Sequence, residues 1–374
     1  MGKIVIAPDS FKGSMSASEV AKTIKEAIMP FTDEEIVMIP VADGGEGSIE
    51  CILNAVSGEK TEVYVTGPEW KGLKCCYAEI EYAKERTAVV EFAESTGITK
   101  QTSYQTGNAT SYGFGQLIRD ALDKGIRRFY LCLGGSATTD GGCGFAAALG
   151  YKFLRNNGRA LEEFVPTGFT LEEIAKIDKS NADSRIKESS FVVLSDVLNP
   201  FYGELGAAYV YAPQKGANEE EVLRLDNGLR HLSEKINEDL GIDVTCIEGT
   251  GAAGGAGGGC IAFLGAKIES GIDGILKISN FEEHVKDATL VITGEGCLDR
   301  QSLMGKVLSG IKKATLGKKI MVFCGICKLE NEELESLGIE ALPISSGKAI
   351  EDSIKNGRQY LYETAVERFK RNCC

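Results

Sequence analysis

Residues 3–28, KIVIAPDSFKGSMSASEVAKTIKEAI, predict one complete strand, turn and helix. The run from Lys3 to Ala7 is short and apolar, which favours a buried strand. Apolar residues then recur at helical spacing up to Ile28, and Ser16 and Glu19 have the spacing of a capping box, which marks a helix start. The turn between them, Asp9 to Ser14, is therefore expected at the carboxyl end of a strand and in front of a helix.

The same pattern follows at once in residues 36–56. A strand is predicted over Ile36 to Val41, the turn Asp43-Gly44-Gly45-Glu46-Gly47 follows it, and a helix is predicted over Ser48 to Val56. Two such units in series are typical of a parallel sheet. Patterns of the same kind return from Ala288 to the C-terminal helix.

The middle of the chain has a different texture. Short β-rich runs begin at Thr61, and the turn residues Gly67-Pro68 indicate a domain boundary. We therefore predict an α/β protein with two α/β domains. Residues 1–67 and 288–374 are expected to form a doubly wound, mostly parallel sheet, and residues 68–287 an inserted α/β domain with a mixed sheet.

Composition excludes several classes of function. The net charge of −13 over 374 residues argues against binding to nucleic acid or to an anionic membrane. The apolar runs are too short to span a membrane, and we expect a cytoplasmic protein whose oligomeric state the sequence does not predict. The 12 cysteines are scattered and are expected to be reduced. We interpret the lone C-x-x-C of Cys324 and Cys327 as small buried residues, with a redox pair or half a zinc site as alternatives.

The turns themselves indicate phosphate chemistry. Glycine-rich turns before helices can bind phosphate through backbone N–H groups, and carboxylates can hold Mg²⁺. Acidic side chains lie at or just after predicted strand ends at Asp9, Asp43, Glu46, Asp140, Asp196, Glu295 and Asp299. Three lysines stand beside glycine, at Lys12, Lys215 and Lys306. Any one of these positions alone fits a simple turn or helix cap, but their association favours a site.

Other nucleotide and catalytic motifs are weaker. There is no P-loop sequence and no protein-kinase signature. Gly249 to Gly254 spells G-x-G-x-x-G, with Glu269 downstream, so a dinucleotide-dependent oxidoreductase is the alternative. The chain has only two histidines, His231 and His284, which disfavours a Ser-His triad or a multi-histidine metal site.

Taken together, the motifs resemble those of the bacterial class I glycerate kinases over essentially the whole chain. The resemblance rests on the segments APDSFKG (7–13), ADGGEG (42–47), LGGSATTDGG (133–142), SDV (195–197), PQKG (213–216), GAAGG (251–255), TGEG (293–296) and Gly305-Lys306. It implies ATP-dependent, Mg²⁺-dependent phosphorylation of D-glycerate, normally at the 2-hydroxyl, on one Rossmann-like and one inserted domain. Cys297, Thr139 and Leu198 depart from the pattern.

Roles for individual residues follow from the needs of phosphoryl transfer, which are metal ligands, phosphate donors and a carboxylate near the acceptor hydroxyl. We expect Asp43, Asp196 and Lys12 to be catalytic, in a cleft between the domains. Phosphate or substrate contacts are predicted for Ser10, Lys12, Gly44, Gly45, Gly134, Gly135, Ser136, Lys215, Gly294, Gly296 and Lys306. Candidate metal ligands are Asp43, Glu46, Asp140, Asp196, Glu295 and Asp299. A kinase of another small hydroxy acid and a non-catalytic nucleotide sensor remain alternatives.

Overall fold

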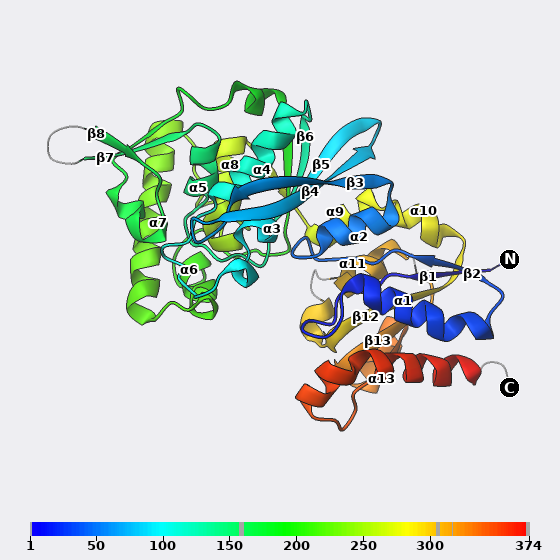
Figure 1. The fold of residues 1–374 in the computed structure, drawn as a ribbon. Helices are drawn as coiled ribbons and strands as arrows, with labels where there is room; N and C mark the ends of the chain where they lie inside the picture. The colour runs from blue at the N-terminus through cyan, green and yellow to red at the C-terminus, as the bar shows by residue number, and fades with distance from the viewer. Residues whose placement is uncertain (1, 157–160, 304–306, 316, 372–374) are drawn as a thin grey trace. The chain divides into compact units, whose positions relative to one another are not determined.

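The computed structural model describes residues 2–156, 161–303, 307–315 and 317–371. Contacts divide the chain into two units (Figure 1). Unit 1 contains residues 1–43, 50–57 and 270–374, and unit 2 contains residues 44–49 and 58–269. These divisions differ from the predicted boundaries at 67 and 288. The first differs because β3 (Gly58–Thr66) pairs with a strand of unit 2. The second differs because α9 (Gly271–Ile278) and α10 (Phe281–Lys286) belong to unit 1.

Unit 1 is built on a five-stranded sheet in the order β14-β13-β12-β1-β2, and every pair of neighbours is parallel. The strands are β1 (Lys3–Ile6), β2 (Glu35–Met38), β12 (Ala288–Leu298), β13 (Ile320–Cys327) and β14 (Ile339–Pro343). The chain runs outward from β1 to β2 on one side and from β12 to β14 on the other. The order therefore reverses between β1 and β12, where open α/β sheets bind ligands beyond the carboxyl ends of their strands.

Helices cover both faces of this sheet. Alternate residues of β13 point to opposite sides, so Phe323 packs with α1 (Ala17–Ile28) and α13 (Ile350–Lys370), whereas Val322 packs with α11 (Val307–Ala314) and α12 (Asn331–Leu337). In Figure 1, α1 and α13 lie side by side near the two chain ends. The doubly wound prediction for this sheet is confirmed.

The start of α1 shows how the sequence sets the geometry of the first turn. The Ser16 hydroxyl accepts a hydrogen bond from the Glu19 N–H at 3.2 Å, and the Glu19 carboxylate accepts one from the Ser16 N–H at 2.8 Å. The predicted capping box is therefore present, and it satisfies two of the N–H groups that a helix start leaves without partners. The helix then buries Val20, Ile24 and Ile28 against β1.

Unit 2 contains a six-stranded mixed sheet in the order β11-β10-β6-β5-β4-β3. Its strands are β3, β4 (Gly72–Tyr82), β5 (Glu85–Glu91), β6 (Arg128–Cys132), β10 (Ser190–Leu194) and β11 (Lys267–Glu269). The four strands from β5 to β11 are parallel, and β3 and β4 continue the sheet as an antiparallel edge. The mixed sheet expected for the inserted domain is confirmed. A separate antiparallel sheet has the order β8 (Leu161–Phe164), β7 (Lys152–Asn156), β9 (Lys176–Asp178).

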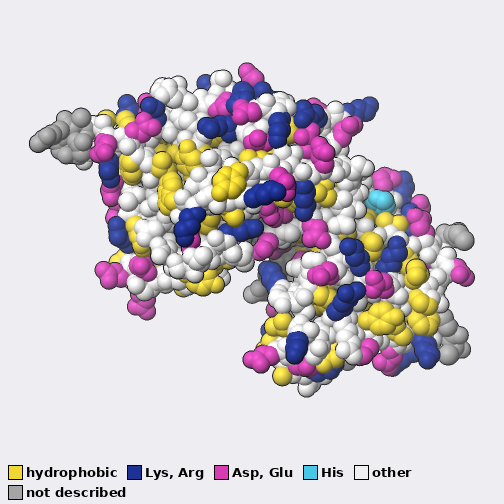
Figure 2. Space-filling view, in the orientation of Figure 1, with side chains coloured by type: hydrophobic (Ala, Val, Ile, Leu, Met, Phe, Trp, Pro, Cys, Tyr) yellow, Lys and Arg dark blue, Asp and Glu magenta, His cyan; other side chains and the backbone are white. Residues whose placement is uncertain are grey.

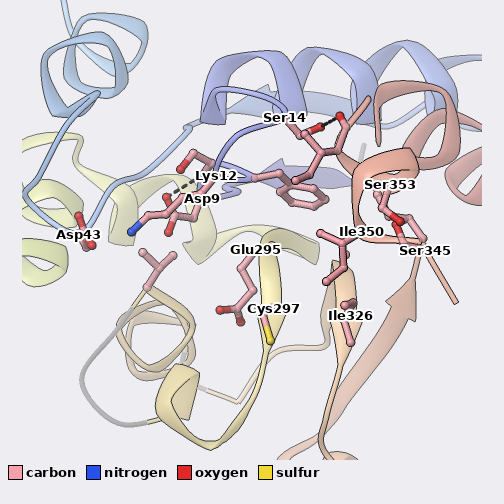
Figure 3. Close-up of a pocket in the computed structure, with 17 residues that line it drawn as sticks. Asp9, Lys12, Ser14, Asp43, Glu295, Cys297, Ile326, Ser345, Ile350 and Ser353 are labelled. Carbon is pink, nitrogen blue, oxygen red and sulfur yellow. Dashed lines mark hydrogen bonds between the residues drawn. The ribbon is translucent and has the colours of Figure 1, made fainter. Parts of the chain in front are cut away.

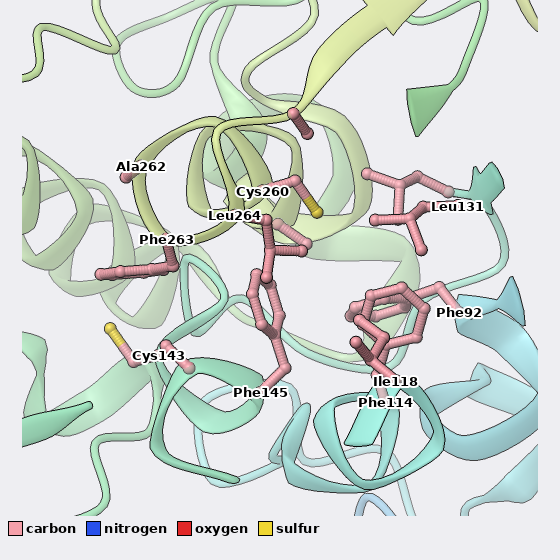
Figure 4. Packing of buried hydrophobic residues seen from close by; sticks show 14 of the residues in the cluster. Phe92, Phe114, Ile118, Leu131, Cys143, Phe145, Cys260, Ala262, Phe263 and Leu264 are labelled. Carbon is pink, nitrogen blue, oxygen red and sulfur yellow. The ribbon is translucent and has the colours of Figure 1, made fainter. Parts of the chain in front are cut away.

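The helices of unit 2 contribute several buried phenylalanines to its core. These helices are α3 (Phe92–Thr96), α4 (Tyr112–Asp123), α5 (Cys143–Ala148), α6 (Ala207–Tyr211), α7 (Glu219–Leu240) and α8 (Ala252–Leu264). Phe92, Phe114, Phe145 and Phe263 form a continuous chain of ring contacts, with centroids 4.9, 5.7 and 6.1 Å apart along it (Figure 4). Such tilted aromatic contacts stabilise a core beyond the area that they bury.

The surface of the protein carries charged side chains of both signs. Basic and acidic side chains are interspersed on the face that Figure 2 shows. Within the described residues, no helix has the length and apolar character that a membrane crossing requires.

Candidate functional site

A pocket of about 390 Å³ lies at the carboxyl edge of the unit 1 sheet, at the reversal between β1 and β12 (Figure 3). Six residues that the sequence singles out, from three separate stretches, line it: Asp9, Ser10, Lys12, Asp43, Glu295 and Gly296. Cys297 of β12 also lines it, together with residues from β13 and the start of α13. Residues predicted near separate strand ends therefore meet within unit 1, whereas the predicted cleft between the domains stays a prediction.

The turn after β1 is anchored by Phe11, which is buried in the core, and closed by hydrogen bonds between the backbones of Phe11 and Met15. Gly13 takes the left-handed backbone that this tight turn requires, with φ of 80°. Lys12 is exposed, and Figure 3 shows its ammonium pointing toward the side of the pocket on which Asp43 lies. The turn thus presents the Lys12 ammonium to the pocket, while the adjacent Phe11 side chain holds the loop in place.

The charged form of the Asp9 carboxyl group is disfavoured in this pocket. Burial, followed by the nearby charge of Asp43, raises the pKa of Asp9 to about 6, although the Ser10 N–H donates a hydrogen bond to it at 2.6 Å. Burial is the larger cause, and the charge of Asp43 adds repulsion to it. A divalent cation would relieve this repulsion, and carboxylate oxygen is the ligand type that Mg²⁺ prefers.

Strand β12 contributes Glu295 from within the strand, which continues to Leu298, and Ser302 fixes the orientation of the Glu295 carboxylate. The Ser302 hydroxyl donates a hydrogen bond of 2.7 Å to the Glu295 carboxylate. Asp299 instead accepts a hydrogen bond from the Ser302 N–H at 3.3 Å and does not line the pocket. Its position at the start of the short helix Arg300–Leu303 fits a cap. Arg300, the nearest basic residue after Cys297, pairs with Glu333 at 3.1 Å.

The glycines of β12 allow the first turn to approach closely. The Gly294 carbonyl accepts a hydrogen bond from the Asp9 N–H at 2.8 Å. A methyl group on Gly296 would lie 3.8 Å from the backbone nitrogen of Lys12, so this glycine borders the Lys12 turn. Gly296 lines the pocket and Gly294 holds the backbone of Asp9, and the predicted phosphate contacts of both glycines stay predictions. Lys306 lies outside the described residues.

A second group of predicted residues meets within unit 2. A methyl group on Gly134 would come within 2.7 Å of the Gly45 Cα, so the turn after β6 and the turn before α2 (Ser48–Ala55) touch backbone to backbone. Gly135 has φ of 60°, and a methyl group on it would lie 3.5 Å from the exposed Glu46 carboxylate. Gly44 is buried in the same segment.

Glu91, which was not among the predicted site residues, holds the turn before α2 in place. Its carboxylate accepts hydrogen bonds from the Gly47 N–H at 3.2 Å and the Ile49 N–H at 2.5 Å. Burial raises the pKa of Glu91 to about 7 against the effect of these N–H donors. The available signal was an acid that ends the apolar run Thr87 to Val90 of strand β5.

Ser136 and Lys215 form a buried pair behind the turn after β6. The Lys215 ammonium donates hydrogen bonds of 2.7 Å to the Ser136 hydroxyl and 2.7 Å to the Thr138 carbonyl. Burial lowers the pKa of Lys215 to about 7, which the charge of Asp140 opposes. The sequence predicted that both residues contact phosphate; the structure gives Lys215 an additional role in positioning the Ser136 hydroxyl.

Asp140 is surrounded by hydrogen-bond donors. Its fully buried carboxylate accepts hydrogen bonds from five groups: the N–H groups of Ser111, Gly142 and Gly144 and the hydroxyls of Ser111 and Thr138, at 2.7 to 3.3 Å. Burial raises its pKa, which these donors oppose. These five donors give Asp140 a role in the shape of the turn, and its predicted use as a metal ligand stays a prediction.

Asp196 follows β10 at the carboxyl edge of the unit 2 sheet and is half-buried. The neighbouring backbone is ordered by the Ser195 N–H, which donates to the Glu269 carbonyl at 3.2 Å, and by the Ser195 hydroxyl, which accepts from the Val197 N–H at 3.3 Å. Its predicted catalytic role stays a prediction. Among the described residues, no group of three or more His, Cys, Asp or Glu side chains is arranged to hold a metal.

The glycines from Gly249 onward have a packing role. A methyl group on Gly254 would lie 2.0 Å from the Thr138 carbonyl, and one on Gly259 would lie 2.5 Å from the Gly141 carbonyl. Residues 241–249 form no strand, so the context that a dinucleotide fingerprint needs is missing and the oxidoreductase alternative is wrong. Cys324 is likewise packed in a hydrophobic cluster, and burial raises its pKa.

Comparison with known proteins agrees with this arrangement. A family model described as the glycerate kinase family matches residues 4–371. The chain is 42% identical to a glycerate kinase of Halalkalibacterium halodurans, with 91% of this chain and 90% of the relative covered. It is also 42% identical to the glycerate 2-kinase of Escherichia coli strain K12, with 85% and 82% covered.

A solved structure has the same fold over the full length. The protein of Salmonella typhimurium LT2 named "putative glycerate kinase 2" superimposes with a TM-score of 0.83 at 35% identity, covering 100% of this chain and 98% of that one. Sequence and fold agree. The chain therefore belongs to the glycerate kinase family, and it is an enzyme of the kinase class.

Proposed function

We propose that the protein transfers the γ-phosphoryl group of MgATP to the 2-hydroxyl of D-glycerate. The observation that carries the proposal is the pocket of unit 1, in which Asp9, Lys12, Asp43 and Glu295 meet at the reversal of a parallel sheet in a chain of this family. Phosphoryl transfer depends on charge neutralisation and positioning, and these side chains supply both.

Asp9 and Asp43 are the residues that would hold Mg²⁺ here. Burial and, to a smaller extent, the charge of Asp43 raise the pKa of Asp9, and a divalent cation beside these two carboxylates would offset both effects. When bound with the nucleotide, Mg²⁺ neutralises phosphate charge and is held by one or two carboxylates together with phosphate oxygens. Binding of Mg²⁺ in this way does not require three protein side chains as ligands. Glu46 and Glu295 stay candidate ligands.

The reaction itself exchanges one P–O bond for another. The oxygen of the glycerate 2-hydroxyl forms a bond with the γ-phosphorus, the bond to the β,γ-bridging oxygen breaks, and ADP leaves. A carboxylate accepts the hydroxyl proton, and Asp43 and Asp196 are the two candidates. Lys12 offsets the charge that gathers on the phosphoryl oxygens.

The turn Gly134-Gly135-Ser136 is proposed to contact phosphate or substrate in unit 2. Glycine-rich turns at the carboxyl ends of parallel strands present N–H groups to anions, and the Ser136 hydroxyl is oriented by Lys215 at 2.7 Å. The prediction that the reaction takes place in a cleft between the domains stays a prediction from the sequence.

Two further proposals concern where and with what the enzyme works. We propose the cytoplasm, because the 12 cysteines are scattered through a long chain, as is usual for proteins of a reducing compartment. The proposed partner is a small hydroxy acid, with no role for nucleic acid or membrane, and the net charge of −13 supports this.

The test is a coupled assay that measures ADP release. ADP release must depend on both D-glycerate and Mg²⁺, and a panel of other small hydroxy acids must give much lower kcat/KM. Turnover with another acid but not with glycerate would replace the substrate and keep the reaction class. Nucleotide binding without turnover on any acid would favour the sensor alternative.

A further inference from the structure

The pocket of unit 1 has two chemically different ends. Figure 3 shows Asp43, Lys12 and Asp9 at one end and Ile326 and Ile350 at the other. The residues of the apolar end come from β13, from the segment after β14 and from the first turn of α13: Ile326, Ile344, Ile350 and Ile354. A ligand that fills the whole pocket therefore needs a charged end and an apolar end.

The apolar end is unusually exposed for isoleucine side chains. Ile350 is 67% exposed, Ile326 is 44% exposed and Ile354 is 42% exposed. A single exposed apolar residue is normal, but three that line one pocket leave a contiguous apolar wall facing solvent. Covering such a wall with a flat apolar group stabilises a complex, because it removes apolar surface from water.

Of the two proposed substrates, only the nucleotide has such a group. Glycerate is a three-carbon acid with an oxygen substituent on every carbon, so it offers no apolar face. The nucleobase of ATP is a flat ring system that packs well against branched aliphatic side chains. This step rests on the proposed function, because it takes ATP and glycerate as the two ligands.

The charges at each end set the direction in which the nucleotide lies. The first turn of α13 carries Glu351 and Asp352, which already complement the positive end of the helix dipole and would repel a phosphate there. Lys12 lies at the opposite end, beside the two carboxylates that fit Mg²⁺. The triphosphate is therefore favoured at the Lys12 end.

We propose that unit 1 holds the nucleotide, with its base against Ile326, Ile350 and Ile354 and its triphosphate toward Lys12. Gly325 supports this geometry, because it lets β13 approach β12 closely: a methyl group on Gly325 would lie 2.4 Å from the Gly296 carbonyl. Glu295 and Cys297 of β12 lie between the two ends of the pocket (Figure 3).

The test separates the base from the phosphates. Isothermal titration calorimetry measures the affinity of the full-length protein for MgATP and for magnesium tripolyphosphate, which lacks the nucleoside. In the double variant Ile350→Ser/Ile354→Ser we expect the Kd of MgATP to rise about tenfold, and the Kd of tripolyphosphate to stay unchanged. Both positions lie in the exposed first turns of α13, where serine is tolerated.

Met29→Ser is the matched control, because Met29 is 59% exposed in unit 1 and does not line the pocket. An unchanged MgATP affinity in the double variant, or an equal loss for ATP and tripolyphosphate, would overturn the assignment while leaving the kinase proposal intact. If the wild-type protein forms phosphoglycerate from D-glycerate, the proposed function stands whichever of these results is found.

Discussion

The ammonium of Lys215 lies 2.7 Å from the hydroxyl of Ser136, and both side chains are buried in unit 2. The contact joins the turn after α6 to the turn after β6. A lysine in such a place is costly to charge, because burial removes the water that would solvate the ammonium. The pair therefore couples the shape of a predicted phosphate-binding turn to the protonation of one lysine.

The first prediction follows from the pKa of Lys215, which is about 7 in the folded protein, whereas the ordinary pKa of a lysine is 10.5. Between these values the unfolded chain binds more protons, so this lysine makes the free energy of unfolding rise with pH by about 1.4 kcal/mol per pH unit. Lys215→Met should remove that slope. Urea unfolding of both proteins between pH 7.5 and 9.5 measures it, and parallel pH profiles would contradict the role assigned to Lys215.

Glu91 gives the opposite dependence. The pKa of Glu91 is about 7 in the folded protein, and its ordinary value is 4.5. Between pH 4.5 and 7 the folded state therefore binds more protons than the unfolded chain. This carboxyl group makes the free energy of unfolding fall as the pH rises through that interval. Glu91→Gln cannot ionise and should gain stability relative to wild type across that interval. Glu81→Gln, an exposed change in the same sheet, is the control and should show no such trend.

Asp140→Asn tests whether this residue shapes the turn or binds metal. An amide places an NH₂ group among the donors that now reach the carboxylate, so we expect a loss of stability on the order of 3 kcal/mol. Thermal and urea unfolding measure it, with the exposed Asp33→Asn as control. A variant that folds as stably as wild type but needs more Mg²⁺ would favour the metal-ligand prediction.

The carboxylates of the unit 1 pocket should act on the reaction and not on the fold. We expect Asp9→Asn and Asp43→Asn to lower kcat on the order of 100-fold and to raise the Mg²⁺ concentration needed for half-maximal rate. Steady-state assays with circular dichroism as the folding check measure this. If Asp43→Asn and Asp196→Asn both kept a kcat near wild type while folded, the carboxylate assignment would be lost.

The sequence predicted the fold well where the local pattern alone determines an element. The first strand, the capping box at Ser16 and the order of strands and helices in unit 1 follow from apolar periodicity and helix-start signals. The observed division into units differs from the predicted one because it depends on long-range strand pairing. Apolar and polar residues alternate in β3, but only its pairing with β4 places it in unit 2.

The site was predictable by residue type and less so by role. Strand-end turns were expected to gather, and Asp9, Lys12, Asp43 and Glu295 do so in one pocket. Asp140 could not be separated from them by sequence, because only the fold shows the donors around its carboxylate. Glu91 was missed because a strand-ending glutamate gives no local sign that it accepts hydrogen bonds from residues 47 and 49.

The reaction is tested most directly by phosphorus NMR of the product. The purified protein is incubated with D-glycerate and MgATP, and the product is compared with authentic 2- and 3-phosphoglycerate. The proposed function predicts ADP and 2-phosphoglycerate in equal amounts. The absence of any phosphoglycerate would contradict it, and 3-phosphoglycerate as the product would contradict the assignment of the 2-hydroxyl.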